Sequence, residues 1–219
     1  MSRRILITGG ASGIGRVIAQ SFYALGDRIA ICDISTIQID SLKQEMPHCL
    51  AVRADVTDIH QMKNLFSKIT EQFGGVDILI SNAGTGGPAG PIENVSLREW
   101  QSCLNVNLDG AFLSCQWAAK VMKAQRNGLI VLISSTSGLF GVPNRSPYVT
   151  AKWGLIGLTK TLAMELGPFG IRVNAICPGA VDGERMQKVI EMESQATGKN
   201  QSEIMRQYED GVSLRRFIK

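Results

Sequence analysis

The sequence predicts an α/β fold: a doubly wound parallel sheet with helices on both faces. Short apolar runs rich in β-branched residues alternate with longer stretches in which apolar residues recur about every 3.6 positions. Most of the short runs are apolar at nearly every position, as a parallel strand buried on both faces requires. The regular alternation of strand and helix therefore indicates one parallel sheet covered by helices.

Six runs are the expected strands and five longer stretches the expected helices. Asp58 is expected to cap the helix that follows it, because its carboxylate can accept from free N–H groups of the first turn. The strands are expected at Arg4–Thr8, Arg28–Asp33, Leu50–Ala54, Val76–Ser81, Leu129–Ser134 and Ile171–Cys177. The helices are expected at Gly13–Leu25, Ile37–Glu45, Ile59–Phe73, Leu97–Gln125 and Tyr148–Leu166.

Two segments break the alternation. Gly84–Pro91 is rich in glycine and proline and cannot form regular structure. Asp182–Gly211 follows the sixth expected strand and mixes methionines with many charged residues. Long excursions after strands are where open α/β sheets bind ligands, so 182–211 is the expected substrate-covering segment. No linker or repeat divides the chain, which predicts a single domain over 1–219.

Composition and charge exclude several classes of protein. Of the 219 residues, 44% are hydrophobic and 19% charged, which excludes intrinsic disorder. The net charge of +4 is too small to indicate a nucleic-acid or membrane partner. No apolar run approaches the ~20 residues of a membrane helix, and the first residues do not form a signal peptide. Five cysteines without a Cys-x-x-Cys pair predict reduced thiols in a cytoplasmic protein.

A glycine-rich segment, Thr8–Gly15, joins the first expected strand to the first helix. Glycines let the backbone turn tightly and approach a pyrophosphate, and the N–H groups and dipole of the helix favour its negative charge. Such a loop alone is also compatible with a plain turn. The preceding strand, the following helix and an acid at the end of the next strand together predict a dinucleotide-binding domain.

That acid is Asp33. Its carboxylate can accept from both ribose hydroxyls of an adenosine and repels a 2′-phosphate. The next residue is Ile34 rather than an arginine, and Arg16 is expected to be a solvated helix residue. The sequence therefore predicts NAD in preference to NADP, although Asp33 could instead only cap the strand end.

Tyr148 and Lys152 lie four residues apart and therefore on one face of a helix. A fixed ammonium favours the ionised form of a nearby phenol, which suits the phenol to acid/base catalysis between an alcohol and a ketone. Elsewhere such a pair is mostly a surface feature, but here it follows a strand that ends in Ser135. No metal site is expected, because His48 and His60 have no ligand spacing around them.

With further motifs, these residues resemble those of the short-chain dehydrogenase/reductase superfamily, which has a Rossmann fold. The likeness covers nearly the whole chain. The matching motifs are Thr-Gly-x-x-x-Gly-Ile-Gly at 8–15, Asp55-Val56, Asn82-Ala83-Gly84, Asn107 within Asn-Val-Asn-Leu, Ser135, Tyr148 with Lys152, and Pro178-Gly179.

The resemblance implies an NAD(P)-dependent oxidoreductase that transfers hydride between NAD and a secondary alcohol or ketone. Tyr148 would transfer the proton and Ser135 would bind the substrate oxygen. Lys152 would bind the nicotinamide ribose, and Asn107 would support a water relay that ends at Lys152. The residues implied to contact the cofactor are Gly9, Ser12, Gly13, Ile14, Asp33, Asp55, Val56, Asn82, Ala83, Tyr148, Lys152, Pro178, Gly179 and Val181.

The chain departs from the family pattern in places. Asp182-Gly183 stands where many relatives carry a threonine that contacts the cofactor. Relatives continue past a segment like Ser213–Arg216 into a helix and a seventh strand, so that C-terminal part is expected to be missing here. Members of the family commonly form tetramers, partly through this last helix and strand. The other common interface corresponds to Leu97–Gln125 and Tyr148–Leu166, which predicts a homodimer or homotetramer.

The substrate is expected to be a small alcohol or ketone of unspecified identity. Arg145, three residues before Tyr148, could bind a substrate carboxylate, but a solvated loop charge is the preferred interpretation. An alternative function is nucleotide binding without catalysis, against which the four implied catalytic residues argue. A reductase of fatty-acid or polyketide synthesis would need NADPH, against which Asp33 argues.

Overall fold

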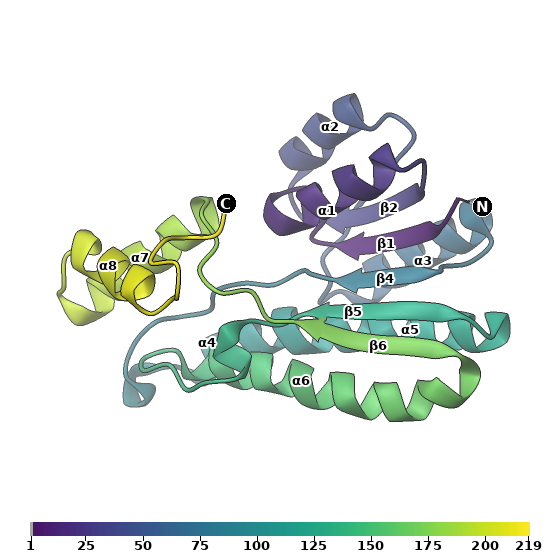
Figure 1. Cartoon of the computed structure of the whole chain (residues 1–219). Helices are drawn as coiled ribbons and strands as arrows, with labels where there is room; N and C mark the ends of the chain where they lie inside the picture. Colours follow the sequence, from purple (N-terminus) through teal and green to yellow (C-terminus); the bar gives the residue numbers. More distant parts are fainter. Residues whose placement is uncertain (1) are drawn as a thin grey trace.

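The computed structural model describes residues 2–219 and is built on a six-stranded parallel sheet (Figure 1). The strand order is β3-β2-β1-β4-β5-β6, so the chain reverses its direction of winding between β1 and β4. The strands are β1 Arg4–Thr8, β2 Arg28–Asp33, β3 Leu50–Arg53, β4 Ile78–Ser81, β5 Gly128–Ile133 and β6 Ile171–Ile176. The predicted fold class is confirmed, and the crevice at a reversal of this kind is where such sheets bind ligands.

Helices cover both faces of the sheet. One face packs on α3, α5 and α6, and the other on α1 and α2, each through a core of aliphatic side chains. Asp58 caps α3 as predicted, accepting from the N–H groups of His60 and Gln61. The helices are α1 Gly13–Ala24, α2 Thr36–Glu45, α3 Ile59–Phe73, α4 Leu97–Leu104, α5 Gly110–Gln125, α6 Ser146–Leu166, α7 Glu184–Thr197 and α8 Gln201–Asp210.

The edge strand β6 has one buried and one exposed face. Ile171 and Val173 are buried against α6, whereas Arg172, Asn174 and Ile176 are exposed on the opposite face. Among the described residues, the α1–α2 layer does not extend across this strand. The alternating sequence of β6 fits a strand with one solvated face.

The predicted helix Leu97–Gln125 is interrupted by a wider π-type turn at Asn105–Asp109, which joins α4 to α5. Single π turns in long helices occur frequently at functional sites, because the extra residue redirects side chains. Here the turn carries Asn107, which is buried. Uniform apolar periodicity gave no indication of this local change.

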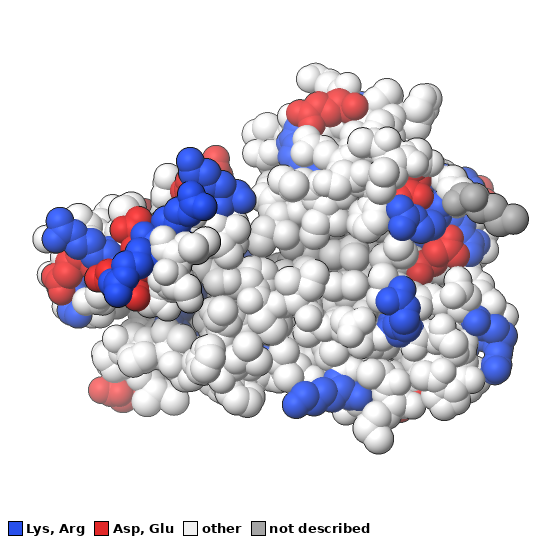
Figure 2. All heavy atoms as spheres, viewed as in Figure 1, with Lys and Arg blue, Asp and Glu red and all other residues white. Residues whose placement is uncertain are grey.

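The segment after β6 forms α7 and α8, which lie beyond the carboxyl ends of the strands (Figure 1). The last residues of the chain pair with the stretch that connects β6 to α7. The Ile218 N–H donates to the Ala180 carbonyl at 2.9 Å, and the Asp182 N–H donates to the Ile218 carbonyl at 2.8 Å. Lys, Arg, Asp and Glu side chains cluster on the surface formed by α7 and α8 (Figure 2). Among residues 2–219, no helix combines the length and the apolar character needed to cross a membrane.

Candidate active site

The glycine loop after β1 is tied to the end of β4. The Asn82 side-chain amide donates to the carbonyls of Thr8 at 3.1 Å and Gly9 at 2.9 Å. In return, the backbone N–H groups of Asn82 and Ala83 donate to Thr8 Oγ1 at 3.0 Å each. Asn82, predicted to line the cofactor, therefore also fixes the shape of the loop.

This loop fits a pyrophosphate. Gly9 and Gly13 have φ values of +60° and +51°, which favour glycine. At Gly15 a Cβ would collide with the Gly9 carbonyl, so the loop also packs tightly. At Gly13, by contrast, nothing within the described residues lies within 4 Å of a Cβ built there. Open space at this point of the loop, next to the start of α1, is compatible with a bound phosphate.

Asp33, which is predicted to bind the adenosine ribose, lies beside this loop. Its carboxylate accepts from the N–H of Ala11 in the glycine loop at 3.2 Å and from that of Ser35 at 3.1 Å. The proposed strand-end cap and the position beside the loop are thus both present. Val56, predicted to flank the adenine, has its side chain buried against Gly110, which leaves its backbone for such a contact.

Asn107 and Lys152 meet beside Gly84. The Asn107 amide nitrogen donates to the carbonyls of Thr85 at 3.1 Å and Cys103 at 2.9 Å. These bonds direct its Oδ1 inward, where that buried oxygen has no donor among residues 2–219. A Cβ on Gly84 would lie 2.7 Å from this oxygen and 3.6 Å from Lys152 Nζ. A buried acceptor without a donor next to an ammonium is suited to a bound water.

Lys152 is buried although it carries a charge. Its ammonium donates to the Ile133 carbonyl at the end of β5 at 2.9 Å. Burial lowers the pKa of Lys152 to about 7, and repulsion from the Arg185 guanidinium contributes to the shift. A lysine held in this way is sensitive to any negative charge brought into the crevice.

Tyr148 lies one turn before Lys152 on α6, half-buried, with Lys152 Nζ 5.6 Å from its ring centroid. Ser135 begins a 3₁₀ turn that packs on α6, and its Oγ accepts from the Ser137 N–H at 3.1 Å. The buried Ser134 hydroxyl joins these two elements by donating to the Lys152 carbonyl at 2.9 Å. The predicted Ser, Tyr and Lys side chains therefore come from elements that contact each other directly.

Pro178, Gly179 and Val181 follow β6 at the same sheet edge. The Thr136 N–H donates to the Pro178 carbonyl at 2.9 Å, which links this stretch to the turn that Ser135 begins. The bonds of Ile218 to this stretch use the Ala180 carbonyl and the Asp182 N–H. Neither bond uses the N–H or carbonyl of Val181, a residue that the family resemblance implies as a cofactor contact.

Arg145 is not the solvated loop charge that the sequence favoured. Only 4% of its surface is exposed. Its guanidinium donates to the Gly86 carbonyl and forms an ion pair with Glu193 of α7, which also accepts from the Tyr208 hydroxyl of α8. Arg185 likewise extends from α7 toward Gly84. The sequence contained no signal for these α7 and α8 contacts, because they join segments about fifty residues apart in an irregular region.

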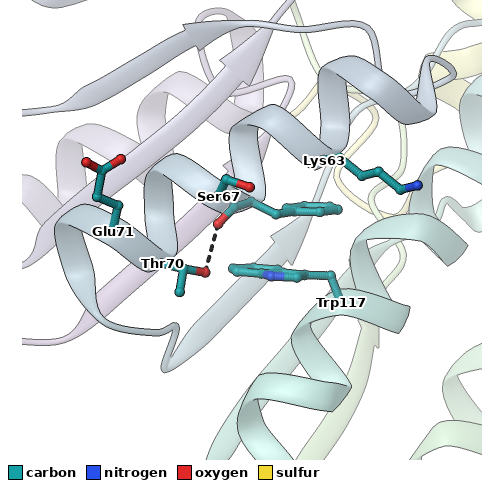
Figure 3. A pocket seen from close by; sticks show the side chains of 6 residues that line it. Lys63, Ser67, Thr70, Glu71 and Trp117 are labelled. Carbon is teal, nitrogen blue, oxygen red and sulfur yellow. Dashed lines mark hydrogen bonds between the residues drawn. The ribbon is translucent and has the colours of Figure 1, made fainter.

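Two surface hollows lie outside this cluster. An open groove of about 650 Å³ between α3 and α5 is lined by Lys63, Phe66, Ser67, Thr70, Glu71 and Trp117 (Figure 3). The rings of Phe66 and Trp117 stack there at 4.5 Å. It lies on the outer helical layer, away from the predicted site residues. A second hollow of about 330 Å³ adjoins the crevice through Asp55 and the start of α4.

Comparison with known proteins agrees with this geometry. A family model described as short chain dehydrogenase matches residues 3–194. Levodione reductase of Leifsonia aquatica is 37% identical over 185 residues, which cover 82% of this chain and 69% of that protein. An NAD⁺-bound xylitol dehydrogenase superposes with a TM-score of 0.94 at 27% identity, over 99% of this chain and 86% of that one. An actinorhodin polyketide ketoreductase with NADPH gives 0.93 at 30% identity, over 100% and 85%.

The matched residues span the sheet, the glycine loop and the helix that carries Tyr148 and Lys152. The fold and the sequence therefore point to the same relatives, among them dehydrogenases and reductases. The chain belongs to the short-chain dehydrogenase family and is an oxidoreductase that acts on CH–OH donors.

Proposed function

We propose that this protein interconverts a secondary alcohol and a ketone with NAD, and that Tyr148 is the general acid/base. The observation that carries the proposal is the convergence of Asn107 Oδ1 and Lys152 Nζ beside Gly84, one helical turn from Tyr148. A bound nicotinamide accepts or supplies the hydride. The residues of the chain bind and orient the reactants and move one proton.

In the oxidation direction, Tyr148 takes the hydroxyl proton of the alcohol as hydride leaves the carbon. In the reverse direction the same phenol protonates the developing alkoxide. Ser135 is proposed to donate to the substrate oxygen, supported by its place in the turn that packs on α6. Asn107 Oδ1, which lacks a donor among the described residues, supports a bound water through which the proton would reach Lys152 and solvent.

NAD rather than NADP is the proposed cofactor. Asp33 supports this choice, because its carboxylate stands beside the glycine loop and would repel a 2′-phosphate. Arg16 is not solvated as expected; its guanidinium is bound by Ser41 and Glu45 of α2. Similar structures carry NAD⁺ or NADPH, so the preference rests on this chain's own residues.

The segment 182–211 is the proposed substrate cover. Its helix α7 supplies Val189 and Met192, each 3.5 Å from a Cβ built on Gly86 in the loop after β4. That loop also lies against Cys103 of α4 and Tyr148 of α6. The cover thus adds an apolar wall close to the proposed acid/base residue.

A homodimer through α5 and α6 is the proposed assembly. Phe112, Trp153 and Met164 on these helices are 48%, 50% and 81% exposed, and large apolar side chains in such numbers favour burial against another protein surface. Sedimentation equilibrium tests this: the wild type is expected to dimerise and Trp153→Glu to shift toward monomer. A monomeric wild type would reject the interface.

We also propose a cytoplasmic location. The five cysteines are free thiols, which a reducing compartment preserves. Fractionation of the cells that make the protein tests it, and recovery outside the cytoplasm would reject it.

The central test is Tyr148→Phe, assayed by NADH absorbance over a panel of secondary alcohols. Turnover is expected to fall by at least about 10³-fold, while NADH affinity stays nearly unchanged. Tyr23→Phe, which removes a phenol hydroxyl on α1, is the matched control and is expected to retain wild-type rates. Undiminished activity of Tyr148→Phe would reject the mechanism. A wild type that binds NADH tightly but turns over nothing would favour nucleotide binding without catalysis.

A further inference from the structure

Arg145 is a buried charge with an incomplete set of partners. It lies directly before α6, and 4% of its surface is exposed. One terminal nitrogen donates to the Gly86 carbonyl at 3.0 Å, and the other reaches Glu193 Oε1 at 3.4 Å. The buried Nε has no acceptor within the part of the chain that the structure describes. A guanidinium has five N–H donors, so most of them are left without a good acceptor.

The residue that follows Arg145 also carries a buried polar group without a hydrogen-bond partner among the described residues. This group is the Ser146 hydroxyl. Buried polar groups are nearly always hydrogen-bonded, and a buried cation is costly unless it is well paired. Two buried donors at adjacent residues, neither with an acceptor among the described residues, are suited to binding an acceptor.

The Arg145 guanidinium lies against the ring of the proposed acid/base residue. The Arg145 guanidinium carbon lies 5.1 Å from the centroid of the Tyr148 ring. A Cβ built on Gly86 would lie 3.6 Å from Arg145 Nη2 and 3.5 Å from Val189 and Met192 of α7. A ligand held by Arg145 would thus lie beside α7 of the proposed cover and near the Tyr148 ring.

Glu193 is a replaceable partner for Arg145. Charge-assisted hydrogen bonds of this kind usually measure about 2.7–2.9 Å, so a contact of 3.4 Å is long. The same carboxylate oxygen accepts from the Tyr208 hydroxyl at 2.6 Å, a short and well-formed bond. Glu193 is therefore positioned mainly by Tyr208 and can give up its contact with Arg145 when a better acceptor arrives.

The charges around the loop after β4 favour an anion. Burial raises the pKa of the Cys103 thiol, which lies under Gly87, while the nearby charges of Arg145, Lys152 and Arg185 act in the opposite direction. Glu193 is the carboxylate that directly contacts this group of cations. A substrate with a negative charge would bring the region closer to neutrality.

We propose that Arg145, with Ser146, binds the carboxylate of the substrate, which is a short hydroxy acid or its oxo-acid partner. The inference rests on the proposed function and narrows its substrate class. The carboxylate is a spectator: the carbinol carbon loses hydride to the nicotinamide, its hydroxyl proton goes to Tyr148, and the oxo acid, NADH and a proton result.

The test compares short 2- and 3-hydroxy acids with their primary amides, which keep the shape but lose the charge. For the acid and amide pair with the highest activity, the wild-type kcat/KM is expected to be at least about tenfold higher for the acid than for the amide. In Arg145→Gln the acid-to-amide ratio is expected to fall by about 10- to 100-fold, the usual value of hydrogen bonds to a charged group. Arg172→Gln, an exposed arginine on β6, is the matched control and should leave the ratio unchanged.

The Glu193→Gln variant distinguishes a role of Arg145 in substrate recognition from a purely structural role. It removes the competing negative charge but keeps an oxygen for Tyr208, so KM for the acid is expected to fall relative to the amide. If Arg145 only anchored α7, this variant would impair acid and amide alike, and that result would overturn the inference. An Arg145→Gln ratio equal to that of the wild type would overturn it as well.

A binding measurement covers the case in which Arg145→Gln fails to fold. Calorimetric titration of wild type with NADH bound, using short carboxylates and their amides, is expected to show tighter carboxylate binding, and Arg145→Lys should retain part of that preference. Equal binding of both ligands would reject the subsite. If the amides are turned over and the acids are not preferred, the carboxylate subsite is rejected but the dehydrogenase function is not. Failure of the subsite can therefore be distinguished from failure of the proposed function.

Discussion

Lys152 of α6 donates a hydrogen bond of 2.9 Å to the carbonyl oxygen of Ile133, the last residue of β5. The bond places a buried ammonium at the carboxyl edge of the sheet, between the 3₁₀ turn after Ser135 and the loop at Gly84. It holds the cation in place, but a neutral carbonyl offsets little of the cost of removing the charge from water.

We therefore expect Lys152→Met to stabilise the cofactor-free protein, and more so at low pH. The pKa of Lys152 is lowered from 10.5 to about 7 on folding, so between these values the unfolded chain holds a proton that the folded chain lacks. Lys152 therefore lowers the free energy of unfolding most below pH 7, and this loss disappears as the pH rises toward 10.5. The gain in unfolding free energy should therefore shrink by about 1 kcal/mol per pH unit between pH 7 and 10.

Urea unfolding at pH 7, 8.5 and 10 measures this difference. Lys63→Met removes an exposed lysine from α3, outside the proposed dimer interface, and is expected to show no such trend. A gain for Lys152→Met that is constant with pH would contradict the burial of a charge at this position.

Gly84→Ala is expected to lower kcat by roughly 10- to 100-fold, because the new Cβ would lie 2.7 Å from Asn107 Oδ1 and displace the proton path. Steady-state rates at saturating NAD check this. Gly90→Ala lies in the same loop, where no described atom comes within 4 Å of the added Cβ, and should retain activity. Equal rates in both variants would show that the space beside Asn107 is dispensable.

Asp33→Ser is expected to shift the NAD-to-NADP preference toward NADP by at least about tenfold, since it removes a carboxylate that repels a 2′-phosphate. Arg53 stands opposite Asp33 in the sheet register and donates to the Ile34 carbonyl, so a cation already lies next to Asp33, where the 2′-phosphate is proposed to bind. Adding Arg53→Gln to Asp33→Ser should reverse the NADP gain. Cofactor ratios of kcat/KM give the answer, and an unchanged ratio in Asp33→Ser would remove Asp33 from cofactor selection.

Gly15→Ala is expected to destabilise the protein by about 1–3 kcal/mol and to weaken NADH binding, because its Cβ would meet the Gly9 carbonyl and the Asn82 amide. Gly141→Ala is the matched control at an exposed loop position with open space, and is expected to change stability by no more than about 0.5 kcal/mol. Thermal unfolding and NADH titration of both variants test this. A stable Gly15→Ala with normal affinity would show that the loop tolerates a side chain.

Much of the fold follows from local sequence alone. Runs such as Arg4–Thr8 and Arg28–Asp33 were predicted to the residue, because a parallel strand buried on both faces leaves an uninterrupted apolar run. The start and end of α3 were predicted because Asp58 caps it and its apolar residues repeat with the helical period. Tyr148 and Lys152 were identifiable for the same reason, since their spacing on one helix fixes their common face.

The tertiary structure decided what depends on contacts between distant segments. The burial of Arg145 could not be predicted, because it is set by Gly86 and by Glu193, which lies 48 residues further along the chain. The π turn at Asn107 and the tie between Asn82 and the glycine loop were likewise invisible, since neither alters the apolar pattern. Periodicity reports which side of an element is apolar; the surroundings of a polar side chain depend on which other elements fold against it.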